Sequence, residues 1–383
     1  MINSSFIRKE NMGFDGENGI ENEKAPNWAT SIPVDNVQEM VRRNSYAVPE
    51  KYIRNLEDRH GNTCLFSAST NNIPVIDLSL LTDNCKEELK KLDLACAEWG
   101  FFQVINHGIA QETLLGMKDA AVSFFELPLE EKEKYSMPPN DIQGYGHAYV
   151  ASTEQKLDWS DALIMVVYPT HYRKYKYWPA TPPGLKDAIE AYSFEVNKVA
   201  KKLLSFLSLI VGMDKEGLLG MHKEIMQALR LNYYPPCSKP DQVIGLSPHS
   251  DTSTISILMQ DEDVTGLQIR HHGEWVSVKP IPNSLVVNIG DVIEIWSNGK
   301  YKSIEHRAVI NDQKARISYA SFICPNDDVE IEPLKQTVGS QEPKKLYKKI
   351  RYGDFLRQSM KRKMEGKAHT DVAKIERNIE KDL

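Results

Sequence analysis

The sequence has few cysteines and no long apolar run. Its 383 residues include only five cysteines, which are scattered and odd in number. No pair of them has the spacing of a zinc ribbon or a redox motif, so we expect reduced thiols in an intracellular protein rather than a disulfide framework. The longest apolar stretch, around residues 203–213, is too short to span a bilayer.

The sequence also lacks an excess of positive charge and a recognisable targeting segment. The formal net charge is −6, from 47 Lys and Arg against 53 Asp and Glu, which argues against a generally nucleic-acid-binding surface. The first thirty residues carry several acidic side chains and no apolar core, which disfavours a transit peptide and a secretory signal. We therefore expect a cytoplasmic monomer without nucleic-acid or membrane partners.

The remaining composition is that of a globular protein with a substantial core, because 41 % of the residues are apolar and 26 % are charged. Residues 1–30 are rich in Asn, Glu, Gly and Ser and are expected to be disordered. The following region, residues 31–225, is expected to combine helices with a few strands. Strands are predicted at 73–78 and 101–105, and helices at 87–98, 111–125 and 186–211.

From residue 226 onward the pattern changes to short, β-branched segments separated by turns. About nine strands are predicted, at 228–234, 244–248, 253–260, 267–270, 275–280, 285–289, 292–296, 302–309 and 316–322. Asn298-Gly299 predicts a hairpin between two of them. This pattern is typical of an antiparallel jelly roll, here at residues 226–330. The tail, residues 331–383, is expected to return to helix.

Three residues of this β-rich region form a candidate metal site. His249 and Asp251 are two positions apart, which points both side chains to the same side of an extended chain, and His306 follows from a distant strand. Two imidazoles and one carboxylate are the ligand set of mononuclear non-haem iron(II) enzymes that activate oxygen. A structural hydrogen-bonded Asp–His pair is the simpler alternative.

That alternative leaves Arg316 and Ser318 without an explanation. Arg316 begins a largely apolar strand, and Ser318 lies on the same face two residues later. A buried arginine needs an anionic partner, which is either an internal carboxylate or the distal carboxylate of 2-oxoglutarate. Tyr234 can add a phenol donor to the second arrangement.

Several segments together resemble the plant 2-oxoglutarate- and iron(II)-dependent oxygenases over nearly all of residues 37–375. The similar segments include Ile73-Pro74-Val75-Ile76-Asp77, Asn106-His107-Gly108, Asn232-Tyr233-Tyr234-Pro235-Pro236, His249-Ser250-Asp251 and Arg316-Ile317-Ser318. Within the family, the chain looks most like the group holding the lateral branching oxidoreductase, codeine O-demethylase and the senescence-related-gene proteins. Gln155-Lys156-Leu157-Asp158-Trp159 is one segment of that more specific likeness. The long acidic N-terminal extension departs from these relatives.

The resemblance implies an α+β fold that is mainly β. Its core would be a distorted double-stranded β-helix, with an N-terminal helical and strand region and a C-terminal helical lid. It also implies an enzyme that binds iron(II), consumes 2-oxoglutarate and O2, and takes ascorbate as a reductant. Arg316, Ser318, Tyr234 and Asn232 would then hold 2-oxoglutarate.

The resemblance places the substrate pocket at Tyr145, His147, Phe322 and the lid. Phe322 shares a strand face with Arg316 by even spacing, so it either stacks on a flat substrate or is an ordinary core residue. The expected substrate is a small hydrophobic plant metabolite, with a strigolactone precursor ahead of an alkaloid O-methyl ether. A non-catalytic binder would more often have lost a metal ligand, and all are present here, which disfavours that alternative. A halogenase usually has a small residue in place of the carboxylate, so Asp251 argues against halogenation.

Overall fold

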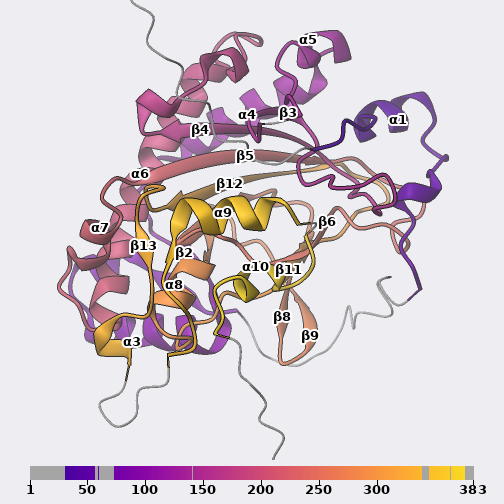
Figure 1. The fold of residues 1–383 in the computed structure, drawn as a ribbon. Helices are drawn as coiled ribbons and strands as arrows, with labels where there is room; N and C mark the ends of the chain where they lie inside the picture. The colour runs from indigo at the N-terminus through magenta and orange to yellow at the C-terminus, as the bar shows by residue number, and fades with distance from the viewer. Residues whose placement is uncertain are drawn as a thin grey trace, which may run out of the picture.

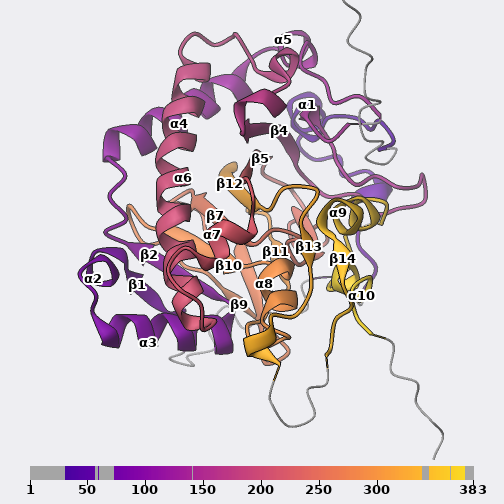
Figure 2. The ribbon, with the colours of Figure 1, turned by 60° about the vertical axis from the view of Figure 1, so that its left-hand side comes forward.

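The computed structural model describes residues 31–56, 59, 73–139, 141–338, 345–362 and 364–375. Two β-sheets enclose the interior, and helices cover the outer side of the larger sheet (Figures 1 and 2). The α+β jelly-roll expectation is thereby confirmed. The expected disordered tail lies outside the described residues, as does most of the acidic extension.

The larger sheet has eight strands in the order β1-β2-β10-β7-β12-β5-β4-β3. Its members are β1 Val75–Asp77, β2 Phe101–Ile105, β3 Gly144–Gly146, β4 Asp161–Tyr168, β5 Met226–Tyr234, β7 Ile255–Gln260, β10 Leu285–Ile289 and β12 Arg316–Cys324. All neighbours are antiparallel except β1 and β2. Four of these strands precede residue 226, so the N-terminal region contributes directly to the sheet.

The smaller sheet has the order β6-β11-β8-β9, and a separate two-stranded sheet joins β13 to β14. These strands are β6 Leu246–His249, β8 Leu267–His271, β9 Glu274–Ser277, β11 His306–Ala308, β13 Glu330–Ile331 and β14 Ile350–Arg351. In β6 and β11, His249 and His306 are register partners. The smaller sheet therefore brings together two of the three candidate metal ligands.

Helices form the outer layer. The α-helices are α1 Val37–Arg43, α2 Leu78–Thr82, α3 Lys86–Leu94, α4 Gln111–Glu126, α5 Leu129–Glu133, α6 Leu185–Ile210, α7 Gly217–Met221, α8 Asp291–Trp296, α9 Tyr352–Met360 and α10 Ala368–Asp371. Short 3-10 segments are η1 Glu50–Tyr52, η3 Thr170–Tyr172, η4 Tyr175–Tyr177 and η5 Lys335–Thr337, and η2 Ala95–Trp99 is a π-helical turn. Helix α6 runs beside α4 on the outer side of the larger sheet (Figure 2).

The packing of α6 fixes which face of the sheet is left for function. Its buried side chains recur at helical spacing, at Ile189, Val196 and Leu203, and form an apolar stripe. Tyr192 meets Tyr319 of β12, with ring centroids 6.5 Å apart. Because side chains alternate along a strand, Arg316, Ser318, Ala320 and Phe322 point away from α6 into the space between the sheets.

One predicted strand is wrong, because residues 292–296 belong to helix α8. All six residues of α8 are buried, including the charged Asp291 and Glu294, so the sequence shows no polar face with a period of two or 3.6. Main-chain contacts fix the helix: the Asp291 N–H donates to the Asp251 carbonyl at 2.8 Å. The prediction of a hairpin at Asn298-Gly299 is also wrong, because this turn follows helix α8 and does not join two strands. Both residues have positive φ angles in the turn.

The C-terminal helices α9 and α10 lie over one end of the space between the sheets (Figure 1). Lys367, just before α10, donates to the buried Glu294 carboxylate at 2.5 Å and to the Ser303 carbonyl at 2.6 Å. The Gly366 N–H donates to the Pro248 carbonyl at 2.8 Å. These contacts tie the helical lid to the end of β6, next to His249.

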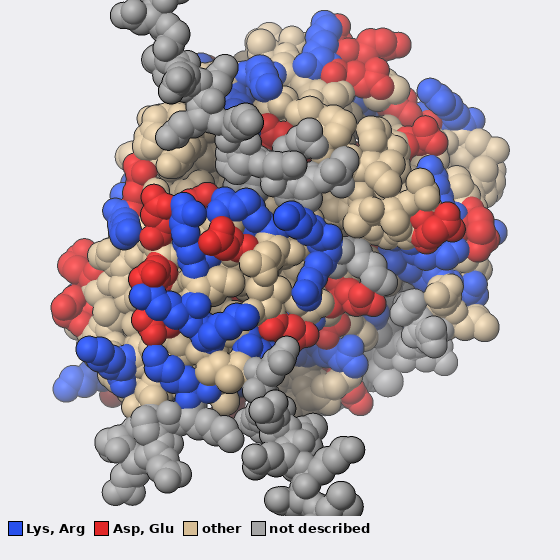
Figure 3. Space-filling view, in the orientation of Figure 1, with Lys and Arg blue, Asp and Glu red and all other residues tan. Residues whose placement is uncertain are grey.

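Basic side chains gather on the face around α9 and β13, with acidic side chains among them (Figure 3). Lys349 pairs with Glu330 at 2.5 Å, and Arg357 pairs with Asp327 at 3.1 Å. Paired charges on a solvated surface contribute little to stability. Among the described helices, none is long and apolar enough to cross a membrane.

Candidate iron and 2-oxoglutarate site

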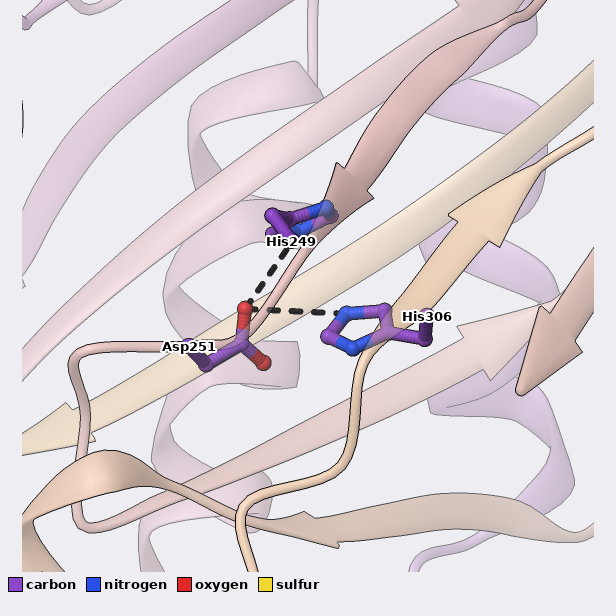
Figure 4. A group of neighbouring side chains, drawn as sticks. All are labelled: His249, Asp251 and His306. Carbon is purple, nitrogen blue, oxygen red and sulfur yellow. Dashed lines mark ion pairs between the residues drawn. The ribbon is translucent and has the colours of Figure 1, made fainter. Parts of the chain in front are cut away.

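His249, Asp251 and His306 converge at one point between the two sheets (Figure 4). Each can offer one ligand atom, and these atoms all lie within 4.8 Å of one another. The Asp251 Oδ1 atom is 3.5 Å from His249 Nε2 and 3.6 Å from His306 Nε2. His249 ends β6 and His306 begins β11, so strand pairing holds the imidazoles side by side, with centroids 4.3 Å apart.

The main chain orients both imidazoles for metal binding. The Nδ1–H of His249 donates to the Ser247 carbonyl at 2.8 Å, and that of His306 donates to the Ile304 carbonyl at 3.1 Å. A proton on Nδ1 leaves Nε2 with its lone pair, and both Nε2 atoms face Asp251. Burial lowers the pKa of His306 to about 4, so its imidazole is neutral at neutral pH, as a metal ligand must be.

Asp251 keeps one carboxylate oxygen free for a metal. Its Oδ2 atom accepts hydrogen bonds from Ser256 at 2.5 Å and from Asn288 at 2.8 Å, while Oδ1 faces the two imidazoles. Burial opposes ionisation, but His306, His249 and the Ser256 hydroxyl hold the pKa of Asp251 below its ordinary value. An anionic oxygen beside two imidazole nitrogens fits a divalent metal such as iron(II).

A small cavity of about 50 Å³ extends from these three residues between the sheets. At its far end lies Arg316, which is 3 % exposed. Ser318 and Asn232 face each other across β12 and β5, with the Asn232 amide donating to the Ser318 hydroxyl at 3.2 Å. Tyr234 lies opposite Arg316, with the guanidinium carbon 5.3 Å from its ring centroid. The structure thus brings all four predicted cosubstrate residues to one cavity wall.

Arg316 lacks the internal carboxylate that a structural role requires. Within the described part of the chain it forms no ion pair, and its neutral partners are the Gln260 amide oxygen, 3.3 Å from Nη2, and the Tyr234 hydroxyl. Its Nε atom is buried without an acceptor. A buried guanidinium with unused donors fits the far carboxylate of 2-oxoglutarate.

A larger cavity of about 140 Å³ lies on the other side of His249 and Asp251. Its wall is mostly apolar and comes from β4, β5, β12 and the lid, including Ile164, Val166, Met226, Phe322, Leu356, Met360 and Met364. Phe322 lines both cavities, so the structure places it where the resemblance implied. An apolar cavity that opens onto the candidate metal ligands is suited to a hydrophobic substrate.

Two predicted pocket residues lie elsewhere. The Tyr145 ring packs against Phe124, and its hydroxyl accepts from the Asn36 amide at 2.5 Å. His147 pairs with the buried carboxylate of Asp161 at 3.0 Å. Neither is among the residues that line the 140 Å³ cavity, because the chain turns between them and Tyr149.

The structure instead adds Tyr149, Arg230 and His369 to the cavity wall. The sequence contained a signal for Arg230, a single cation in an apolar strand at even spacing from Asn232 and Tyr234. Tyr149 and His369 carried no such signal, since one lies in an irregular segment and the other in the lid.

Comparison with known proteins gives one consistent result. A model of the 2OG-Fe(II) oxygenase superfamily matches residues 225–325. A model of the non-haem dioxygenase in morphine synthesis, N-terminal, matches residues 73–181.

Individual relatives cover most of the chain. It is 44 % identical over 351 residues to the protein Lateral Branching Oxidoreductase 1 of Arabidopsis thaliana, which covers 89 % of this chain and 96 % of the relative. It is 36 % identical over 349 residues to codeine O-demethylase of Papaver somniferum, covering 90 % and 97 %. The crystal structure of JOX2 in complex with 2OG, Fe and JA superimposes with a TM-score of 0.83 at 34 % identity, covering 91 % of this chain and all of that one.

Proposed function

Because the chain belongs to the 2-oxoglutarate- and iron(II)-dependent oxygenases, and is thus an oxidoreductase that uses both, we propose that it oxidises a small hydrophobic plant metabolite. The reaction is hydroxylation, or oxidative demethylation where the attacked carbon is an O-methyl group. The observation that carries this proposal is the apolar 140 Å³ cavity beside His249 and Asp251.

We assign the metal to His249, Asp251 and His306, and 2-oxoglutarate to Arg316, Ser318, Tyr234 and Asn232. Iron held by these residues would supply the activation of O2 that couples decarboxylation of 2-oxoglutarate to oxidation of a substrate C–H bond. The chain's own residues position the cosubstrate and the substrate and keep water away from the reacting carbon. Arg316 fixes one end of the cosubstrate by charge-assisted hydrogen bonds.

The lid supplies the shelter. Leu356, Met360 and Met364 face the cavity from α9 and the segment after it, and they oppose Ile164 and Phe322 of the larger sheet. Apolar walls on both sides exclude water from the reacting carbon and hold a substrate by its apolar surface. Phe322 is suited to stack on a flat or multi-ring skeleton.

Two substrate classes follow from the relatives. A strigolactone precursor ester is the first candidate, by likeness to the lateral branching oxidoreductase, and an alkaloid O-methyl ether is the second, by likeness to codeine O-demethylase. Both are apolar multi-ring or terpenoid-derived molecules with an exposed methyl or methylene.

Coupled turnover tests this proposal. The purified chain, with iron(II), 2-oxoglutarate, O2 and ascorbate, is incubated with apolar candidates and with small polar acids and amino acids, and succinate is compared with oxidised product. We expect the ratio to approach one only for apolar molecules. Tight coupling with polar molecules alone would reject the substrate class and leave the iron chemistry intact.

We further propose that the protein is a cytoplasmic monomer without nucleic-acid or membrane partners. The net charge of −6 supports the absence of a nucleic-acid partner. Light scattering of the purified chain and imaging of a tagged copy test it. We likewise propose residues 31–225, 226–330 and 331–383 as the N-terminal region, jelly-roll core and lid.

A further inference from the structure

Asp158 lies on a segment that joins the N-terminal part of the chain to the residues just before strand β6. On one side of it, the Leu157 N–H donates to the Lys51 carbonyl at 2.8 Å. On the other side, the Trp159 N–H donates to the Ile244 carbonyl at 2.8 Å. Main-chain hydrogen bonds on both sides therefore fix the position of Asp158.

The side chains of Asp158, Arg54 and Ser247 form a closed set of hydrogen bonds. Arg54 Nη2 donates to Asp158 Oδ1 at 2.5 Å and to the Ser247 hydroxyl at 3.1 Å, and that hydroxyl donates to Asp158 Oδ1 at 2.5 Å. The side chains of Arg54 and Asp158 are 10 % and 15 % exposed, and Ser247 is buried. Charge-assisted hydrogen bonds are strong where little water competes for them, so this set determines where Ser247 lies.

Ser247 connects this set to a candidate metal ligand. Its carbonyl accepts the Nδ1–H of His249 at 2.8 Å, which leaves the Nε2 lone pair of that imidazole for a metal. Its hydroxyl is held by Asp158, so one residue is fixed by its side chain and orients the imidazole by its main chain. The equivalent carbonyl for His306 belongs to Ile304, whose apolar side chain cannot form such a link. Only the His249 imidazole is therefore supported in this way.

From this series of contacts we propose that Asp158 is a positioning residue for the metal centre. With Arg54 it holds Ser247 in place, and the Ser247 carbonyl then holds the His249 imidazole in the orientation that binds iron(II). The inference rests on the proposed assignment of His249 as a metal ligand. Removing a hydrogen-bond partner of a metal ligand typically weakens metal binding by about 10- to 100-fold, and Asp158 acts one contact further away, so we expect the lower figure.

The metal affinity of four variants tests this role. Asp158→Ala removes the carboxylate, Ser247→Ala removes the hydroxyl and keeps the carbonyl, and Ser247→Thr keeps both groups. Glu190→Ala is the matched control, because Glu190 also pairs with a buried arginine side chain, that of Arg173, at 2.8 Å, but lines neither cavity.

Three measurements on the full chain separate positioning from support of the fold. Anaerobic titration calorimetry gives the iron(II) affinity, and the visible absorption spectrum of the cobalt(II)-substituted protein reports the geometry of the metal centre. Urea unfolding of the metal-free chain gives the stability. A purely structural ion pair would change the stability alone.

Asp158→Ala and Ser247→Ala should each weaken iron(II) binding by about 10-fold and alter the cobalt(II) spectrum, whereas Ser247→Thr and Glu190→Ala should stay within about twofold of the wild type. The double variant Asp158→Ala/Ser247→Ala should bind iron(II) no more weakly than the weaker single variant, because both changes break the same link.

Unchanged iron(II) affinity and an unchanged cobalt(II) spectrum in both alanine variants would overturn the inference, and so would additive losses in the double variant. If Asp158→Ala does not fold, Ser247→Ala decides the question, because it retains the pair between Arg54 and Asp158. His249→Ala separates these results from failure of the proposed metal site. Undiminished iron(II) affinity in that variant would reject the site and this inference with it, whereas a loss in His249→Ala alone would reject only the role of Asp158.

Discussion

At the residue scale, function depends on which atoms are left unsatisfied. The Nδ1–H groups of the two imidazoles donate to main-chain carbonyls, and the Oδ2 atom of Asp251 accepts hydrogen bonds from Ser256 and Asn288. What remains is two lone pairs and one anionic oxygen that face one another. Supporting hydrogen bonds of this kind fix the tautomer and the orientation of metal ligands.

Replacing His249, Asp251 or His306 with Ala is therefore expected to abolish turnover with the fold largely retained. Each change removes one of three ligands, so iron(II) affinity should fall by orders of magnitude, which anaerobic titration calorimetry measures. His171→Ala, at an exposed position, is the matched control. Undiminished iron affinity in all three variants would contradict the assignment of these residues as metal ligands.

Arg316→Met is expected to raise the KM for 2-oxoglutarate by about 100-fold, since a charge-assisted fork to a carboxylate is worth about 1.5–3 kcal/mol and about 1.4 kcal/mol corresponds to a factor of ten. Steady-state kinetics at saturating substrate measure it. Arg270→Met, at a half-exposed surface position, is the control. Unchanged 2-oxoglutarate kinetics would show that Arg316 does not serve the cosubstrate.

At the element scale, an ion pair to a buried carboxylate is one of the contacts that hold the lid. Lys367 is the cation that pairs with Glu294, whose side chain is 4 % exposed. Lys367→Met should lower the free energy of unfolding by about 1–3 kcal/mol and speed amide exchange in α10, because Glu294 loses a charged donor. Lys361→Met, at the exposed end of α9, is the control. Equal exchange rates in both variants would mean that Lys367 does not hold the lid.

The contribution of the α7–β7 contact to stability should depend on pH. His222 contacts Leu218 and Thr254, and burial lowers its pKa from 6.5 to about 4. Between these values the unfolded chain binds the extra proton, so this stability is complete above pH 6.5 and is lost as the pH falls to about 4. The 2.5-unit difference corresponds to about 3 kcal/mol.

Urea unfolding at several pH values measures this effect. His222→Gln should lower the slope of the unfolding free energy against pH by about 1.4 kcal/mol per pH unit, because one fewer proton is taken up on unfolding. The exposed His171→Gln variant is the control. Identical slopes in wild type and His222→Gln would contradict the prediction.

The success of the sequence analysis varied with the kind of element. Periodic signals sufficed for α4 and α6, and Gly100 at φ +61° ends the helical stretch before β2. The strand predicted at 292–296 was wrong, because a helix that is buried on every side shows no amphipathic period and its β-branched residues favour a strand. Strand β4 was not assigned, although its run Ala162–Val167 is apolar.

The candidate site was predictable to a different extent on its two sides. The metal and cosubstrate residues lie in strands β5, β6, β11 and β12 or, for Asp251, two residues after β6, so a linear pattern contains them. The cavity wall draws on the irregular segment with Tyr149 and on the lid with His369, which are brought together only by tertiary folding. Tyr145 lies in the short strand β3, and the sequence did not show which face of that strand meets the cavity.

At the scale of the whole molecule, two cavities meet at the metal ligands, and both lie against the inner face of the larger sheet. The narrower cavity reaches Arg316, and the wider one has a mostly apolar wall and is closed by the lid. Helices α4 and α6 cover the opposite face of the larger sheet, which leaves the inner face for binding (Figure 2). A polar cosubstrate and an apolar substrate can therefore reach one metal from different sides.

The most direct test is an anaerobic crystal structure of the full chain with iron(II) and 2-oxoglutarate, with data collected at the iron absorption edge. The account predicts one anomalous peak bonded to His249 Nε2, His306 Nε2 and a carboxylate oxygen of Asp251, with the far carboxylate of 2-oxoglutarate on Arg316. An iron peak away from these three residues, or a cosubstrate bound without Arg316, would contradict it.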